Sequence, residues 1–203
     1  MSTLISCEHI KISIGSTIIK ENFSIHFSAG DVLIITGSNG SGKSTLLRYL
    51  CGSYFHRGIH LNGTPSKLMN ITGGFDKYLS AIENLVVFGH RLKLINKSQP
   101  LYINKILETA NLSQDILPLK TSQLSHGTVM RLAFAISYLY SKNRDFMVMD
   151  EWLSVGDLSF KAKANELLRE LVSDYGKGLI LATNSLPPKL SQNQVILDLD
   201  KSI

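Results

Sequence analysis

The residues best suited to chemistry form a glycine-rich loop at positions 37–45, with the sequence Gly-Ser-Asn-Gly-Ser-Gly-Lys-Ser-Thr. The aliphatic run at 32–35 predicts a buried strand before this loop, and the leucines that follow it predict a helix. In this setting the glycines let consecutive N–H groups face phosphate oxygens, and the helix N-terminus adds a positive dipole end. Lys43 is expected to contact the β- and γ-phosphates of a nucleoside triphosphate, and Ser44 to bind Mg²⁺. The expected nucleotide-binding residues of the loop are Gly37, Ser38, Asn39, Gly40, Ser41, Gly42, Lys43, Ser44 and Thr45.

Two acids follow a second aliphatic run. Residues 146–149 predict a strand buried in a parallel sheet, which places Asp150 at its carboxyl end, where open α/β sheets bind their ligands. We therefore expect Asp150 to contact the magnesium, directly or through water. Glu151 is the expected general base that polarises the attacking water. The plain alternative is a pair of surface acids after a strand.

These loops need a sheet and helices to position them. A third buried strand is predicted at 179–182, and the apolar stripe at 160–172 predicts a helix between the last two strands. At the N-terminus, residues 4–19 predict two short strands with a turn at 15–16, and residues 23–27 predict a further half-buried strand. The middle of the chain has helical patterns and no such strands. We expect it to form a helical lobe at about 75–141.

The composition is that of a globular chain. The sequence has 203 residues, of which 44% are hydrophobic and 18% charged, with a net charge of +5. These values exclude a disordered or collagen-like chain, and no apolar run approaches the roughly 18–20 residues that span a bilayer. Lys and Arg are scattered, so no nucleic-acid partner is expected. Cys7 and Cys51 have no metal-binding spacing and no secretory signal is evident, so we expect an intracellular protein with one domain over 1–203.

A third motif lies between the loop and the acids. Leu124-Ser-His-Gly-Thr128 opens an apolar helix with Ser125 at the N-cap position, where its hydroxyl and free backbone N–H groups can face an anion. The order of phosphate loop, Ser-x-Gly motif and Asp-Glu pair resembles the ATP-binding cassette (ABC) ATPases over essentially the whole chain. More narrowly, the chain resembles the ATPase subunits that export O-antigen, capsular polysaccharide and teichoic acid. The segments that carry this narrower resemblance are Gly-Gly-Phe-Asp at 73–76, Glu83-Asn84, Met-Arg-Leu-Ala-Phe-Ala at 130–135, and 149–157, which ends in Val-Gly-Asp.

The resemblance implies an α/β fold: a P-loop NTPase core with a mixed sheet flanked by helices, an inserted helical lobe, and antiparallel strands at the N-terminus. It implies ATP and Mg²⁺ as ligands, and a homodimer that encloses ATP between the phosphate loop of one chain and Ser125 and Gly127 of the other. Asp157 joins the expected nucleotide-binding residues. An integral membrane permease would dock beside the lobe near Gly74 and Phe75, at the cytoplasmic face of the inner membrane. The implied function is ATP hydrolysis that powers export of a polysaccharide or lipid-linked glycan.

Several departures from the family pattern bear on turnover. The motif at 124–128 replaces Leu-Ser-Gly-Gly-Gln, no glutamine occurs between Gly52 and Ser98, and Ile14 stands where an aromatic side chain commonly stacks on adenine. Asn184 stands where the family has a switch histidine, and its amide can hydrogen-bond a γ-phosphate but cannot carry a proton. We therefore expect Asn184 to act in catalysis, and hydrolysis to be slow. Three alternatives stay open: a haem-exporter ATPase of cytochrome c biogenesis, a soluble non-transport ABC ATPase, and a regulator that scarcely hydrolyses ATP.

Overall fold

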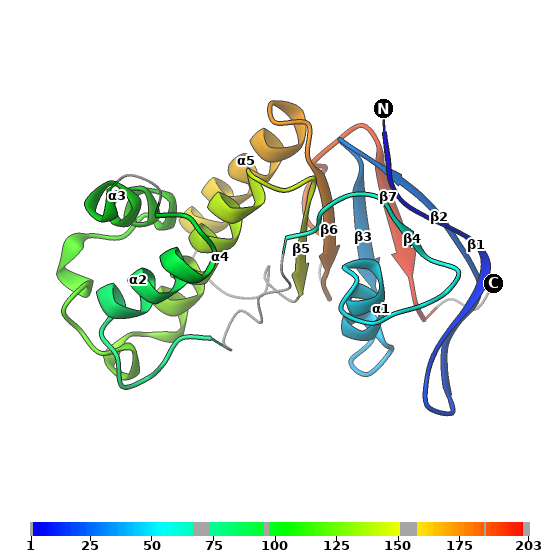
Figure 1. Cartoon of the computed structure of the whole chain (residues 1–203), viewed down its shortest axis with the longest axis horizontal. Helices are drawn as coiled ribbons and strands as arrows, with labels where there is room; N and C mark the ends of the chain where they lie inside the picture. The colour runs from blue at the N-terminus through cyan, green and yellow to red at the C-terminus, as the bar shows by residue number, and fades with distance from the viewer. Residues whose placement is uncertain (1, 67–73, 96–97, 151–157, 185, 201–203) are drawn as a thin grey trace.

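The chain folds into two sheets and a group of helices, placed side by side along the long axis of the molecule (Figure 1). The computed structural model describes residues 2–66, 74–95, 98–150, 158–184 and 186–200. In chain order the elements are β1 (Thr3–Ile14), β2 (Thr17–Ser28), β3 (Val32–Thr36), α1 (Lys43–Leu50), β4 (His60–Leu61), α2 (Ala81–Arg91), α3 (Gln99–Ala110), the 3₁₀ helices η1 (Gln114–Ile116) and η2 (Thr121–Gln123), α4 (His126–Ser141), β5 (Phe146–Asp150), α5 (Leu158–Ser173), β6 (Gly178–Ala182) and β7 (Gln194–Asp198). The predicted α/β fold, with antiparallel strands at the N-terminus and helices against a parallel sheet, is confirmed.

The parallel sheet positions the chemistry. Its strand order is β5-β6-β3-β7, and every neighbouring pair is parallel. Alternate residues of β3 face opposite sides of the sheet. Leu33 and Ile35 pack with the leucines of α1, whereas Val32 and Ile34 pack with residues of α4 and α5. Because all four strands run in one direction, their carboxyl ends form a single edge, and the phosphate loop leaves β3 at that edge.

One prediction about strands is wrong, and one strand of the parallel sheet was missed. The strand predicted at 23–27 is not separate, because it is the second half of β2. The turn predicted at 15–16 is present, so β1 and β2 form one long antiparallel hairpin in place of three short strands. Strand β7 was not predicted. It lies at the edge of the sheet, where Val195 is 61% exposed, so it lacks the continuous burial that β3, β5 and β6 show.

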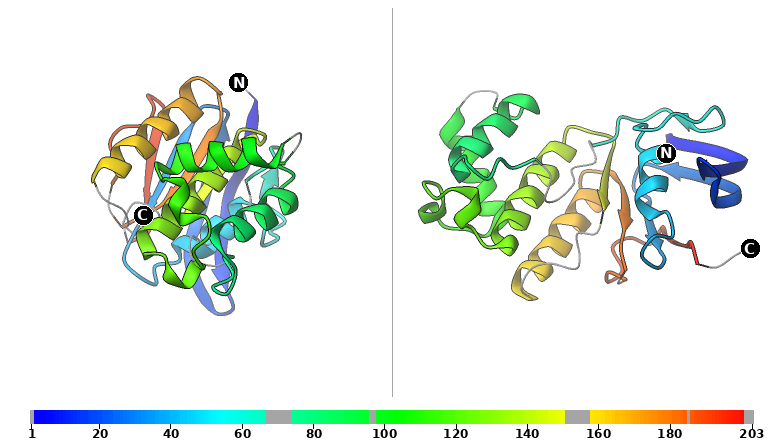
Figure 2. Two further views of the ribbon diagram at one scale, coloured as in Figure 1. Left: turned by 90° about the vertical axis from the view of Figure 1, so that its left-hand side faces the viewer. Right: turned by 90° about the horizontal axis from the view of Figure 1, so that it is seen from below.

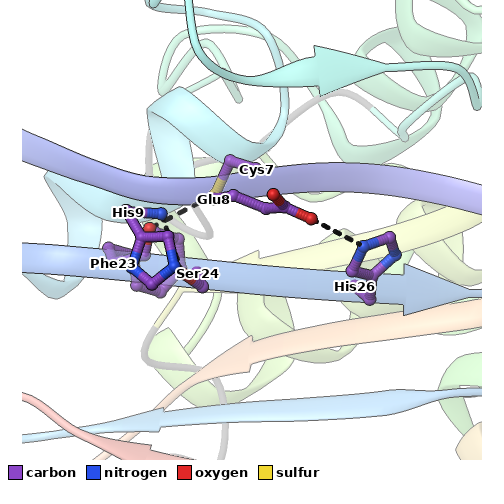
Figure 3. Close-up of polar contacts among 6 residues, drawn as sticks. All are labelled: Cys7, Glu8, His9, Phe23, Ser24 and His26. Atoms are coloured by element: carbon purple, nitrogen blue, oxygen red, sulfur yellow. Dashed lines mark hydrogen bonds and ion pairs between the residues drawn. The ribbon is translucent and has the colours of Figure 1, made fainter.

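Strands β1 and β2 stay paired over their whole length although their register shifts at several points. His9 and Asn22 both adopt positive φ angles, +49° and +51°, at two successive shifts in the register between β1 and β2. The backbone N–H of His9 donates to Ser24 Oγ at 2.8 Å, which replaces a backbone bond of the ladder (Figure 3). On the same hairpin, Glu8 and His26 form an exposed pair with Oε1 and Nε2 3.8 Å apart. These polar contacts thus lie on the exposed side of the hairpin.

The helical lobe lies at the opposite end of the parallel sheet from the N-terminal hairpin (Figure 2). Helices α2, α3 and α4 share one apolar core, which includes Leu85, Ile106 and Ile136. Helix α2 begins at a capping box, in which Ser80 and Glu83 satisfy each other's backbone N–H groups. Buried Asn84 ties the lobe together, since its amide donates to Thr121 Oγ1 at 2.9 Å. Across the part of the chain that the structure describes, no helix is both long and apolar enough to cross a bilayer.

Candidate nucleotide-binding site

The phosphate loop joins the carboxyl end of β3 to the N-terminus of α1. Gly42 is the N-cap residue of α1, with φ +99°, and it contributes no side-chain cap. The first turn of α1 holds no acidic residue, so the free N–H groups and the dipole of this helix end are available to an anion. A Cβ at Gly42 would approach Ile19 Cγ2 to 2.6 Å. Glycine is therefore required here both by its backbone angle and by the close approach of β2.

Lys43 lies inside the loop and is only 5% exposed. Its Nζ donates to the carbonyl oxygens of Gly37 at 2.7 Å and Ser38 at 2.9 Å, which folds the ammonium back over the start of the loop. An ammonium has three donors, so one N–H remains for an anion held by the loop. The loop thus places a positive charge among its own backbone groups, as a phosphate site needs.

Asp150 stands at the same sheet edge, two strands away from the loop. It ends β5 and pairs with Ala182 of β6, while β6 in turn pairs with β3. Its Oδ1 is buried, and no donor within the described ranges reaches it. A buried carboxylate oxygen without a donor is costly, and it fits a hard cation such as Mg²⁺, which prefers oxygen ligands. Ser44, in the first turn of α1, would supply the hydroxyl ligand.

The chain that follows β6 also reaches the loop. The side-chain amide of Asn184 donates to Asn39 Oδ1 at 3.0 Å, so the residue at the switch position lies against the phosphate loop. Thr183 continues the strand, because its N–H donates to the carbonyl of Ile35 at 3.0 Å. The structure therefore brings Asn184 together with the loop, and its expected role in catalysis stays a prediction. Glu151 and Asp157 lie outside the described residues.

Ser125 caps α4 on the lobe side of the molecule. Its Oγ accepts from the N–H of Thr128 at 3.1 Å, which confirms the predicted N-cap. A Cβ at Gly127 would meet nothing nearer than Ser125 Oγ at 3.8 Å, so packing within this chain does not demand a glycine there. Helix α4 packs on the face of the parallel sheet opposite α1. Within one chain, the structure therefore does not bring the motif at 124–128 and the phosphate loop into one site.

One residue of the site was missed by sequence reasoning. Asp200 follows β7, and its carboxylate accepts from both the N–H and the hydroxyl of Ser38. The sequence holds one signal, the aliphatic run at 195–197 followed by acids, which resembles the run before Asp150. Reading that run as a fourth core strand would have placed Asp200 at the sheet edge.

Comparisons with known proteins identify the family of the chain. A family model described as "ABC transporter" matches residues 20–154. The teichoic acids export ATP-binding protein TagH of Bacillus cereus (strain ZK / E33L) is 36% identical over 168 residues, which are 81% of this chain and 30% of that protein. The O-antigen export system ATP-binding protein RfbE of Yersinia enterocolitica is 31% identical over 157 residues, 75% of this chain and 64% of that protein. The chain thus spans from under a third to just under two thirds of the length of these relatives.

The fold also has close counterparts among solved structures. The structure described as a dimeric, post-hydrolysis state of the ATP-binding cassette MJ0796 bound to ADP and Pi has a TM-score of 0.74 and 17% identity, and the match covers 97% of each chain. At this identity the likeness concerns the fold alone. Together with the family match, it confirms the resemblance seen in the motifs. The chain belongs to the ABC transporter family.

Proposed function

We propose that the chain is the ATP-binding and ATP-hydrolysing subunit of an ABC exporter that moves a polysaccharide or lipid-linked glycan outward across the cytoplasmic membrane. The observation that carries the ATPase part is the shared sheet edge, where Lys43 lies within the phosphate loop and Asp150 has a buried oxygen that no donor among the described residues reaches. The relatives named for teichoic acid and O-antigen export support the glycan part.

The residues divide the work of ATP hydrolysis among three strand ends. The N–H groups at the start of α1 and the third N–H of Lys43 would hold the β- and γ-phosphates. Asp150 and Ser44 would hold Mg²⁺, which when bound neutralises charge on the phosphate oxygens. Glu151 would accept the proton of the attacking water, and Asn184 would hydrogen-bond the γ-phosphate. Because Asn184 cannot carry a positive charge, we expect it to stabilise the transition state less than a protonated histidine would.

The motif at 124–128 would act on ATP in a second copy of the chain. Ser125 and Gly127 lie at the N-terminus of a sixteen-residue helix without acids in its first turn, which makes that end attractive to an anion. Since one chain keeps this end apart from its own phosphate loop, a homodimer with ATP between the two subunits uses both. The dimeric description of the structural counterpart supports this arrangement.

Transport would require a membrane partner. We place the chain at the cytoplasmic face of the inner membrane, with an integral permease subunit beside the lobe near Gly74 and Phe75. Phe75 packs on Phe88 of α2 with ring centroids 5.1 Å apart, so a push at this loop would move α2 directly. Tyr78, three residues on, is 71% exposed and available for contact.

The exporter assignment is tested by affinity purification of the tagged chain from gently solubilised native membranes, followed by mass spectrometry. We expect a stoichiometric membrane protein with several spans whose own relatives move glycans. A permease of haem export would replace the glycan assignment. A homodimer alone, or ribosomes, would overturn the exporter reading in favour of a soluble ABC ATPase or regulator.

A further inference from the structure

The chain beyond β7 runs along the start of the phosphate loop. The N–H of Leu199 donates to the carbonyl of Thr36 at 2.9 Å, so the pairing with β3 continues past the end of β7. The Cβ of Leu199 lies 3.3 Å from the position that a Cβ at Gly37 would take. This close packing carries the next residue, Asp200, onto the first turn of the loop.

Both carboxylate oxygens of Asp200 accept hydrogen bonds from one residue of that turn, Ser38. Oδ2 accepts from the backbone N–H of Ser38 at 2.6 Å, and Oδ1 accepts from the Ser38 hydroxyl at 2.9 Å. Hydrogen bonds to an ionised acceptor are roughly twice as strong as neutral ones. The backbone N–H of Asp200 donates to Asp198 Oδ1 at 3.1 Å, which fixes the turn that presents the carboxylate.

Ser38 links Asp200 to the ammonium group of Lys43, because it hydrogen-bonds to both. Its N–H is held by Asp200 and its carbonyl accepts from Lys43 Nζ at 2.9 Å, so the same residue is fixed on both sides. The next residue, Asn39, is held by Asn184 at 3.0 Å. The first half of the phosphate loop is therefore held by hydrogen bonds to Asp200, which follows β7, and to Asn184, which follows β6.

We propose that Asp200 is a positioning residue, which preorganises the phosphate loop for nucleotide by fixing Ser38 and, through it, Lys43. The proposal rests on the proposed ATP binding. A loop that is only partly populated in its competent form binds with a dissociation constant raised by the inverse of that population. The carboxylate also carries a negative charge, which by itself would repel a triphosphate. The two effects have opposite signs, so experiment can separate them.

The test measures the dissociation constant of MgATP by titration calorimetry for the whole chain and for Asp200→Ala and Asp200→Asn. The proposal expects Asp200→Ala to weaken binding about tenfold, from the loss of two charge-assisted bonds at an exposed site. Asp200→Asn keeps one acceptor oxygen and should fall between wild type and Asp200→Ala. Tighter binding of MgATP by both variants would show that repulsion between the Asp200 carboxylate and the triphosphate outweighs the effect of the two hydrogen bonds to Ser38, and would overturn the proposal.

A matched control and a double variant test the route through Ser38. Asp115→Ala removes another exposed carboxylate that accepts from a serine hydroxyl, Ser113 Oγ at 3.1 Å, but in the lobe, so it should leave the dissociation constant unchanged. In a Ser38→Ala background the effect of Asp200→Ala should shrink, because one of its two bonds is already absent. Equal effects in both backgrounds would contradict the proposed route.

Two further readouts separate positioning from general damage. In steady-state hydrolysis, Asp200→Ala should raise KM about tenfold with kcat within about twofold, because the loop holds the phosphates alike in ground and transition states. Without nucleotide, hydrogen exchange of residues 37–42 should accelerate in Asp200→Ala while the exchange of β5 and β6 is unchanged. Wild type that binds no nucleotide would overturn the proposed function alone, since the exchange experiment still decides whether Asp200 orders the loop. Unchanged exchange at 37–42 would overturn the positioning role.

Discussion

The start of α1 lies so close to the hairpin that we expect Gly42→Ala to lower the free energy of unfolding. Gly42→Ala would force a residue with a Cβ to φ +99°, which costs about 1–2 kcal/mol, less about 0.4–1 kcal/mol from the restricted unfolded chain. The new Cβ would also lie 2.6 Å from Cγ2 and 3.0 Å from Cγ1 of Ile19. These atoms are on the branch of a stiff side chain and cannot swing away, so overpacking adds about 1–3 kcal/mol. We expect a total loss of about 1–4.6 kcal/mol in the free energy of unfolding.

The loop offers a matched control. Gly40 has φ +86°, and a Cβ there would meet nothing within 4 Å, so Gly40→Ala tests the backbone strain alone, with an expected loss of about 1 kcal/mol or less. In an Ile19→Ala background, Gly42→Ala should cost about as much as Gly40→Ala. The assay is urea unfolding followed by far-ultraviolet circular dichroism, compared at constant m-value. Equal losses for Gly40→Ala and Gly42→Ala in the wild-type background would refute the close approach.

Three other predictions concern Mg²⁺ binding, stacking on adenine and the pH dependence of stability. Asp150→Asn should raise the Mg²⁺ concentration needed for half-maximal ATP binding about tenfold or more, measured by magnesium titration, because it replaces the charged carboxylate, whose buried oxygen meets no donor among the described residues, by a neutral amide; an unchanged midpoint would refute the metal role. Ile14 lies at the hairpin end and is 46% exposed. Ile14→Tyr should lower the dissociation constant of ATP about fivefold or more, since stacking of a base on an aromatic ring contributes about 1–3 kcal/mol. An equal gain in affinity for tripolyphosphate, which has no base, would contradict contact with adenine. Two hydrogen bonds from Thr64 lower the pKa of Asp145 below its ordinary value, so its stabilisation exists above the unfolded-state pKa and is lost as pH falls through the folded one. Asp145→Asn should therefore lower the free energy of unfolding in urea at about pH 7, and this loss should shrink as the pH falls through the folded-state pKa of Asp145; a loss that does not change with pH would count against this linkage.

The parts of the site that were predicted from the sequence are those encoded locally. The phosphate loop, its flanking strand and helix, and the Ser125 cap each depend on residues a few positions apart, so spacing alone indicates their geometry. Asp150 was placed at the sheet edge by the aliphatic run before it. In each case a short pattern carries the whole structural requirement.

The parts that were missed depend on contacts far apart in the chain. Asp200 and Ser38 are 162 positions apart, and only the parallel pairing of β3 with β7 brings them together. The hairpin was divided wrongly because its register shifts at His9 on β1 and again at Asn22 on β2, which breaks the alternation that marks a continuous strand. Neither feature has a local signature as strong as the glycine-rich loop.

We propose that this sheet edge hydrolyses ATP, and phosphate release by the purified chain with MgATP, compared with Glu151→Gln, tests this without a membrane partner. We expect slow but measurable turnover in the wild type, a loss of about a hundredfold or more in Glu151→Gln, and ATP binding retained in both. Turnover in Glu151→Gln equal to that of the wild type would show that Glu151 is not the general base.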